Sequence, residues 1–225
     1  MENMHLMLFF CLVAPLSMML SVLRGRSRAL LAFLLTGTVM CLLAGEINGL
    51  IANRTDLSFY FMTVNITPIV EEILKALPIV YIAFLMCPGR QLLLEASVAV
   101  GVGFATMENT YLIFDYGSSL TIGELLTRGF GAGMMHGICT LAVGFSMTIV
   151  GRNRRMSCAG TVASLSVAMI YHSVYNIMVQ SKYPIIGILL PVITYLPLIP
   201  LMIRNRAGAA NQTDEQPETV GKIRQ

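Results

Sequence analysis

Polar residues inside otherwise apolar stretches are the candidates for chemistry in this chain. The first group interrupts the run 68-PIVEEILKALPIV-80, and the others follow in three later apolar runs. They are Glu71, Glu72 and Lys75, then Glu108 and Asn109, then His136, and last His172 and Asn176. Charged side chains at mid-membrane are costly and usually line a functional interior. His172 and Asn176 are four residues apart and therefore share one face of a helix.

Carboxylates combined with histidine and amide side chains point to several kinds of chemistry. In a hydrolase, a glutamate acts as general base toward water, and histidine or asparagine donors stabilise the oxyanion of a peptide bond under attack. Alternatively, two histidines and a glutamate bind a divalent metal that activates the water. A proton- or metal-coupled transporter also places glutamate and histidine at mid-membrane.

A purely structural role is the remaining alternative for these charges. Glu71 and Lys75 are four residues apart, so the lysine is expected to neutralise one glutamate. The side chains of Asn109 and Asn176 could likewise simply form hydrogen bonds between helices. Neither explanation covers the second glutamate and the two histidines, which favours a functional site.

The elements that must position these residues are membrane helices. Of the 225 residues, 56% are hydrophobic and 12% are charged, whereas soluble domains carry about 25% charged residues. The mean hydropathy is +0.72. We therefore expect an integral membrane protein whose main partner is the lipid bilayer. The net charge of +3 is small, and no basic stretch alternates with aromatic residues, which excludes nucleic acid as a partner.

Apolar runs separated by polar breaks predict an all-α bundle of about seven transmembrane helices. These cover 4–23, 29–52, 59–87, 92–115, 129–150, 158–180 and 184–203. The third run is too long for one straight helix, and Thr67-Pro68 predicts an N-cap at which the helix restarts. Residues 1–203 are expected to form one transmembrane domain, and the polar composition of 204–225 predicts a disordered cytoplasmic tail.

The distribution of basic residues predicts the orientation. Eleven Lys and Arg residues lie in the first, third and fifth loops and the tail, against three on the opposite face. The positive-inside rule then places the N-terminus outside and the C-terminus in the cytoplasm. At the helical rise per residue, Glu108, His136 and His172 all lie about 11 Å below the outer surface. Four helices are thus expected to bring them to one depth with Glu71 and Glu72.

Small residues and two further polar residues flank this layer. GVGFA precedes Glu108 and GFGAG precedes His136, and small residues let membrane helices approach closely. Glu46 and Asn48, in the sequence GEING, either line the same cavity or mark the interfacial end of their helix.

Four ordered motifs resemble the PrsW family of intramembrane proteases. These motifs are VEEILK (70–75), GFATMENTY (103–111), His136 in a glycine-rich helix, and HSVYN (172–176). Members of the family show an EExxK helix, a GxGFAxxEN segment followed by Tyr, a His in the next helix and a final HxxxN. The family belongs to a wider clan with the CAAX prenyl endopeptidases and the bacteriocin-processing membrane proteases. The match covers about residues 65–180.

The resemblance implies proteolysis of a membrane-anchored protein near the outer leaflet of the bacterial cytoplasmic membrane. PrsW-like enzymes make the first cut in an anti-sigma factor, which leads to release of a sigma factor for envelope-stress genes. The expected substrate is therefore a single-span membrane protein of the anti-sigma-factor type. With no large extracytoplasmic domain, substrate selection is expected to come from the membrane groove or from short loops such as 116–128.

The resemblance also suggests roles for the glutamates. Relatives use a glutamate as the water-activating base, which makes Glu71 the first choice and Glu72 the second. Glu108 stands where the prenyl-protease relatives carry a histidine. Its role therefore stays open between metal ligand, proton relay and electrostatic partner.

The remaining motif residues would support this chemistry. His136 and His172 would orient water or, with Glu108, bind a metal such as zinc. Asn176 would donate to the oxyanion, with Lys75 and Asn109 in supporting positions. The resemblance leaves open both a metalloprotease and a metal-free glutamate mechanism.

Overall fold

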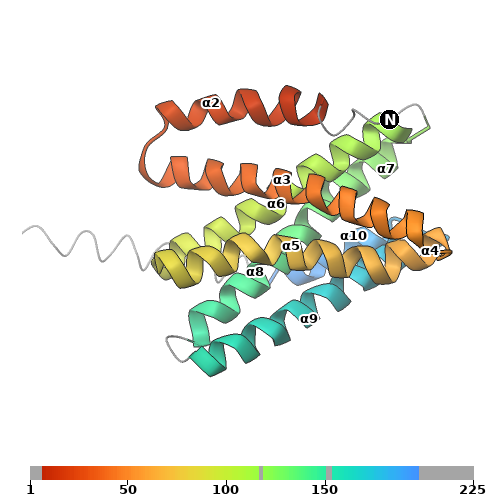
Figure 1. Cartoon of the computed structure of the whole chain (residues 1–225). Coiled ribbons are helices and arrows are strands. Elements are labelled where there is room, and N and C mark those ends of the chain that lie inside the picture. Colours follow the sequence, from red (N-terminus) through yellow and green to blue (C-terminus); the bar gives the residue numbers. More distant parts are fainter. Residues whose placement is uncertain (1–6, 117–118, 151–153, 198–225) are drawn as a thin grey trace, which may run out of the picture.

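The computed structural model describes residues 7–116, 119–150 and 154–197, and every regular element in them is a helix (Figure 1). This confirms the predicted all-α class. The elements are the π-helical stretch η1 (Phe9–Val13), α2 (Ala14–Val22), α3 (Gly25–Arg54), α4 (Phe59–Phe61), the π-helical η2 (Met62–Ile66), α5 (Thr67–Tyr81), the π-helical η3 (Ile82–Met86), α6 (Arg90–Tyr116), α7 (Ile122–Leu126), the π-helical η4 (Thr127–Ala132), α8 (Gly133–Val150), α9 (Arg154–Val179) and α10 (Ile186–Tyr195).

Helix α5 is the centre of the bundle, since it contacts α3, α6, α8 and α9. Around it, α6 packs between α3 and α8, and α8 packs on α9. The N-terminal helix α2 lies along α3 at the edge of the molecule (Figure 1). Any side chain on the inward face of α5 can therefore meet partners from four helices.

Two glycines of the predicted GVGFA segment allow the closest helix contacts around the site. A Cβ atom at Gly103 would collide with the backbone carbonyl of Leu34 on α3, and one at Gly101 with the carbonyl of His136 on α8. The two glycines thus bring α6 close to both neighbours, as the sequence predicted. In the GFGAG segment the prediction holds for Gly131 alone, where a Cβ atom would lie 3.0 Å from the Tyr175 hydroxyl, whereas Gly129 and Gly133 face no neighbour.

The predicted restart of the third helix at Thr67-Pro68 is confirmed only in part: α5 begins there with Pro68 in its first turn, but Thr67 is not an N-cap and the helix is not interrupted. The helical backbone runs without a break from Phe59 to Met86, and the residue that caps its start is Ser58, whose hydroxyl accepts a bond from the Phe61 amide at 3.2 Å. Proline has no N–H and its ring crowds the preceding turn. The π-helical stretch η2 directly before Pro68 widens that turn, so the chain passes the proline while remaining helical.

The fifth predicted helix begins earlier than Gly129. Its N-cap is Thr121, whose side chain accepts from the Glu124 amide while the Glu124 carboxylate accepts from the Thr121 backbone. This capping box starts α7 inside the segment predicted as a loop. The residues that follow it, η4, therefore lie on a fixed helical path beside the bundle.

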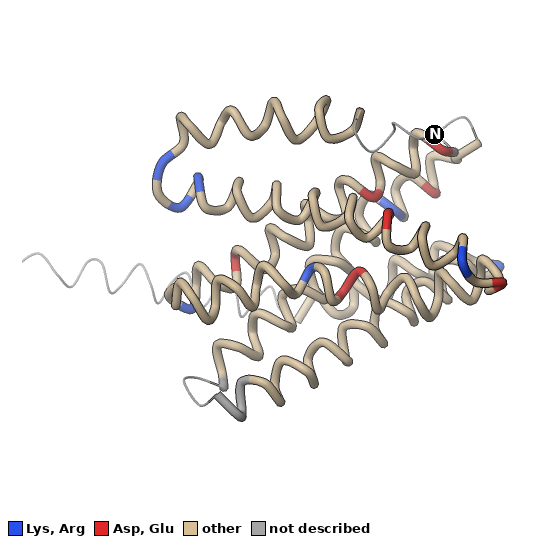
Figure 2. Tube along the Cα trace, in the orientation of Figure 1, with Lys and Arg blue, Asp and Glu red and all other residues tan. Residues whose placement is uncertain are grey.

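Three helical runs are long and apolar enough to cross a membrane: α3, Ile122–Ile149 and Cys158–Val179. The apolar helices Phe9–Val22 and Ile186–Tyr195 are shorter. Figure 2 shows charged positions mainly at helix ends, with a group of Lys and Glu in the middle of α5. The count of seven crossings and the orientation of both termini stay predictions, and the tail 204–225 lies outside the described residues.

Candidate active site

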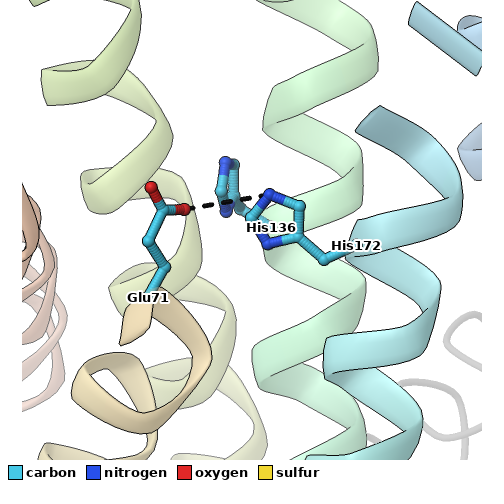
Figure 3. A group of neighbouring side chains, drawn as sticks. All are labelled: Glu71, His136 and His172. Carbon is cyan, nitrogen blue, oxygen red and sulfur yellow. Dashed lines mark ion pairs between the residues drawn. The ribbon is translucent and has the colours of Figure 1, made fainter. Parts of the chain in front are cut away.

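Side chains from α5, α8 and α9 converge in the interior of the bundle (Figure 3). Glu71, His136 and His172 are all buried, and one oxygen or nitrogen of each lies within 4.8 Å of those of the other two. The centroids of the two imidazole rings are 4.9 Å apart, and the ring planes are nearly perpendicular. The structure thus brings together residues that lie up to 101 positions apart in the chain.

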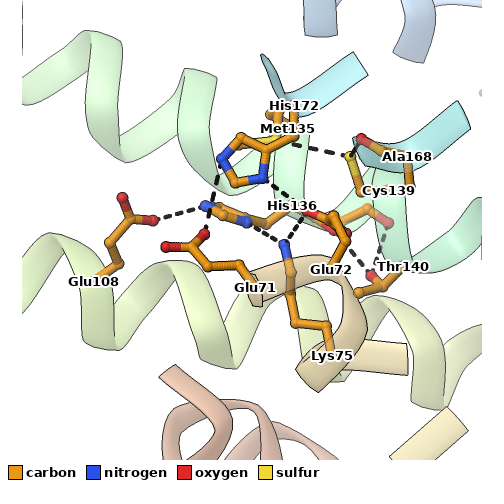
Figure 4. Close-up of polar contacts among 11 residues, drawn as sticks. Glu71, Glu72, Lys75, Glu108, Met135, His136, Cys139, Thr140, Ala168 and His172 are labelled. Atoms are coloured by element: carbon orange, nitrogen blue, oxygen red, sulfur yellow. Dashed lines mark hydrogen bonds and ion pairs between the residues drawn. The ribbon is translucent and has the colours of Figure 1, made fainter. Parts of the chain in front are cut away.

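The buried lysine pairs with Glu72 and not with Glu71, contrary to the pair suggested by sequence spacing. Lys75 Nζ lies 2.5 Å from Glu72 Oε1, and both side chains are fully shielded (Figure 4). The same Glu72 oxygen accepts a bond from His172 Nδ1 at 2.8 Å. Glu72 therefore neutralises the lysine and orients the histidine at the same time.

The contacts of His172 fix its tautomer. Because a carboxylate only accepts, Nδ1 carries the proton that is donated to Glu72. Nε2 then presents a lone pair toward Glu71, whose Oε2 lies 3.8 Å away. That Glu71 oxygen is buried and has no hydrogen-bond partner among the described residues.

His136 is held from both sides by charged groups. Lys75 Nζ lies 2.6 Å from its Nδ1, and its Nε2 lies 2.7 Å from Glu108 Oε2 (Figure 4). An ammonium group only donates, so Nδ1 accepts and the protonated Nε2 donates to Glu108. The Lys75 ammonium also lies 4.7 Å from the centroid of the Phe104 ring, which is a cation–π contact.

Two cavities have Glu71 and Glu108 in common in their linings. The large cavity, of about 630 Å³, lies between α3, the segment 59–71 and α6. The small cavity, of about 180 Å³, lies between that segment, η4 and the C-terminal part of α9. Residues that line both are Phe59, Thr63, Thr67, Glu71 and Glu108. The two cavities therefore adjoin each other along these five residues.

Glu72 and Lys75 line neither cavity, whereas His136, His172 and Asn176 line the small one. Glu46 and Asn48 line the large one, as the first interpretation of GEING expects.

The two asparagines predicted in the site both hold a backbone carbonyl. Asn176 Nδ2 donates to the Thr63 carbonyl at 2.8 Å and so fastens η2 to α9. Asn109 Nδ2 donates to the Arg128 carbonyl at 3.3 Å and so ties α6 to η4. Asn176 keeps one further amide hydrogen for another acceptor, whereas Asn109 lies outside the lining of both cavities.

Residues that the sequence did not single out also line the small cavity. Tyr175 is buried, and its hydroxyl has no hydrogen-bond partner in the described part of the chain. Gln180 exchanges hydrogen bonds with Thr63, and Arg128 projects from η4. Tyr175 follows His172 by three positions, so a helical wheel could have placed both on one side of α9. Nothing in the sequence indicated Arg128.

The donor set fits a divalent metal in residue type and in position. Glu71 Oε2 and His172 Nε2 face each other with free lone pairs, and Glu72 on the far nitrogen of His172 is the carboxylate contact typical of metal-bound histidines. The third ligand within reach is His136, because the ligand atoms that lie within 4.8 Å of one another belong to Glu71, His136 and His172. Glu71 thus takes the place that the sequence analysis gave to Glu108, which instead bonds His136 Nε2.

A comparison with models of known protein families covers all the residues of this site. The family model described as PrsW family intramembrane metalloprotease matches residues 25–202, which include the helices that carry every site residue. No curated protein and no solved structure gave a match to the chain. The chain therefore belongs to the PrsW family of intramembrane metalloproteases.

Proposed function

We propose that this protein cleaves a single-span, membrane-anchored protein of the anti-sigma-factor type, with Glu71 as the group that activates water. Intramembrane proteolysis follows from the family; the substrate class and the role of Glu71 are the proposal. The observation that carries it is the buried Glu71 Oε2, which has no hydrogen-bond partner among the described residues although Glu71 lines both cavities.

Glu71 and His172 are arranged to bind one water molecule. Both facing atoms are acceptors and lie 3.8 Å apart, too far for a bond to each other. A water between them would donate one hydrogen to each and direct its oxygen lone pairs into the cavities. Glu71 would then take the proton as the water attacks a peptide carbonyl and return it to the departing amine.

The other side chains support this step. Glu72 holds His172 in the tautomer whose Nε2 can accept, and Lys75 holds both Glu72 and His136. The remaining amide hydrogen of Asn176 is a donor for the oxyanion. When bound, a metal held by Glu71, His136 and His172 would supply Lewis acidity to the water.

The two cavities provide room for an extended chain on both sides of Glu71. The large cavity has the size of a ligand-binding pocket, for which about 300–1,000 Å³ is typical, whereas the small one is below that range. Several residues of the substrate would occupy the first and a single side chain the second. The backbone between them would cross the carboxylates.

Cleavage of a single-span reporter in reconstituted vesicles tests this proposal. His172→Ala removes the second water acceptor, and we expect a loss of cleavage of roughly 10²–10⁴-fold, the usual contribution of proton-transfer catalysis. Unchanged cleavage by a folded His172→Ala protein would refute the assignment. Treatment with a chelator followed by metal add-back separates the two routes of water activation, because only a metalloenzyme loses and regains cleavage.

A further inference from the structure

The small cavity contains a cation that the proposed reaction does not use. Arg128, on η4, is the one Lys or Arg residue among the described residues that line the two cavities. Its backbone is fixed by the bond from Asn109 Nδ2 to its carbonyl. The guanidinium is within electrostatic range of the Glu108 carboxylate and the Tyr175 hydroxyl.

The acids near Arg128 are already engaged elsewhere. Glu108 accepts the bond from His136 Nε2 at 2.7 Å. Glu124, one turn before Arg128, accepts from the backbone and the hydroxyl of Thr121 at 2.8 and 2.7 Å. Within the part of the chain that the structure describes, the Arg128 side chain forms no ion pair. A half-buried guanidinium without an anion is unusual, since Arg is the side chain best suited to bind carboxylates in pairs of hydrogen bonds.

A second hydrogen-bond donor without an acceptor in the described part of the chain, the Tyr175 hydroxyl, lies in the same cavity wall. Tyr175 is 3% exposed, and its hydroxyl has no partner among the described residues. A buried hydroxyl normally finds an acceptor. Arg128 and Tyr175 therefore both have hydrogen-bond donors that are free to bind an acceptor in the small cavity.

The two cavities differ in charge on the two sides of the reaction centre. Beyond the shared Glu71 and Glu108, the large cavity adds the acidic Glu46 and no basic residue. The small cavity adds Arg128 and no further acid. An acidic side chain of a bound peptide would be repelled on the first side and paired on the second.

We propose that the small cavity is a subsite for an acidic substrate side chain next to the scissile bond, recognised by the Arg128 guanidinium with the Tyr175 hydroxyl as second donor. This inference rests on the proposed proteolytic function, because the same cavity contains His172 and Glu71. Its volume of about 180 Å³ suits one side chain. The subsite makes the specificity directional: an acid is accepted on one side of the cut and rejected on the other.

A reporter series tests the subsite. Single-span reporters that differ only in carrying Glu, Gln or Lys at one position, scanned on either side of the cut, are cleaved in phosphatidylcholine vesicles. The wild type is compared with Arg128→Gln, Arg128→Glu and the control Arg54→Glu. Arg54 is exposed at the end of α3 and lines neither cavity. We expect the wild type to prefer Glu over Gln at one position by roughly 10–100-fold in kcat/KM, the value of a hydrogen bond to a charged group.

The variants carry the decisive outcomes. Arg128→Gln should cleave the Glu and Gln reporters equally well, and Arg128→Glu should prefer Lys at that position. Arg54→Glu should retain the wild-type preference. An equal loss on all reporters would mean that Arg128 merely balances Glu108, and would overturn the subsite. A requirement for anionic lipid in place of an acidic reporter would overturn it as well, because the cation would then bind a phosphate headgroup.

The result also separates this inference from the proposed function. Equal cleavage of the Glu and Gln reporters at every position by the wild type overturns the subsite alone. No cleavage of any reporter by the wild type overturns both proposals.

Discussion

Helices α5, α6 and α8 each contribute to two layers of the interior, one aliphatic and one charged. The aliphatic layer consists of Ala76, Ile79, Ile82, Leu93, Ala96, Val100, Val143 and Met147. The charged layer consists of Glu71, Glu72, Lys75, Glu108 and His136, with His172 added from α9. On α5 the two layers follow directly on each other, so the same backbone supports both.

The two layers tolerate change differently. An aliphatic side chain contributes by filling space, and its neighbours can partly relax around a smaller residue. Each member of the charged layer except Glu71 instead satisfies one or two others, so removing one of them leaves a buried charge without a partner. Apart from Glu71, the charged layer is therefore stable only as a complete set, which also holds its histidines in defined tautomers.

The largest effect on stability is expected from Lys75→Met. This change leaves Glu72 buried without its cation, and we expect the protein to lose about 3–5 kcal/mol of stability. Unfolding of the purified protein in detergent measures it. The double variant Glu72→Gln/Lys75→Met removes both charges and should recover part of the loss. A double variant no more stable than Lys75→Met would argue against the ion pair as the cause.

A smaller effect is expected one turn further along α5, in the aliphatic layer. Ile79 is fully buried, and Ile79→Val should cost about 0.5–1.5 kcal/mol through the lost methylene group. Reporter cleavage should stay near the wild-type rate, because Ile79 lines neither cavity. A loss of cleavage without a loss of stability would show that the two layers are coupled more tightly than the contacts indicate.

The smallest effect is expected at the ion pair between Arg26 and Glu95, near the starts of α3 and α6. The Arg26 side chain is 53% exposed, and exposed ion pairs contribute little to stability because water and salt screen them. Arg26→Gln should therefore shift unfolding slightly and leave cleavage unchanged. A destabilisation as large as that of Lys75→Met would mean that burial does not distinguish the two pairs.

The convergence of the site could be predicted from the sequence, because apolar runs set the helix ends and each polar residue lies at a countable depth. Glu108, His136 and His172 were expected at one level, and their side chains do meet. Counting residues from the helix ends gives only the depth of each side chain, however. It does not give the face of each helix that turns inward, because that depends on contacts with other helices.

The pairing of Lys75 shows this limit. Spacing favours Glu71 as its partner, but Glu72 also meets His172 from α9, so the tertiary contact decides which glutamate is buried with the lysine. Arg128 and Tyr175 could not be found for the same reason, since their importance lies in a shared cavity wall. The capping box at Thr121 and Glu124, by contrast, was readable as T-x-x-E and would have placed the start of α7 correctly.

The adjacent glutamates provide the most direct test of the central claim, that Glu71 faces the reaction and Glu72 the scaffold. The measurement is reporter cleavage and thermal unfolding of Glu71→Gln and Glu72→Gln, made side by side under the same conditions. We predict that Glu71→Gln unfolds at or above the wild-type temperature and has lost cleavage, whereas Glu72→Gln unfolds at a clearly lower temperature. Wild-type cleavage by a folded Glu71→Gln protein would contradict the account.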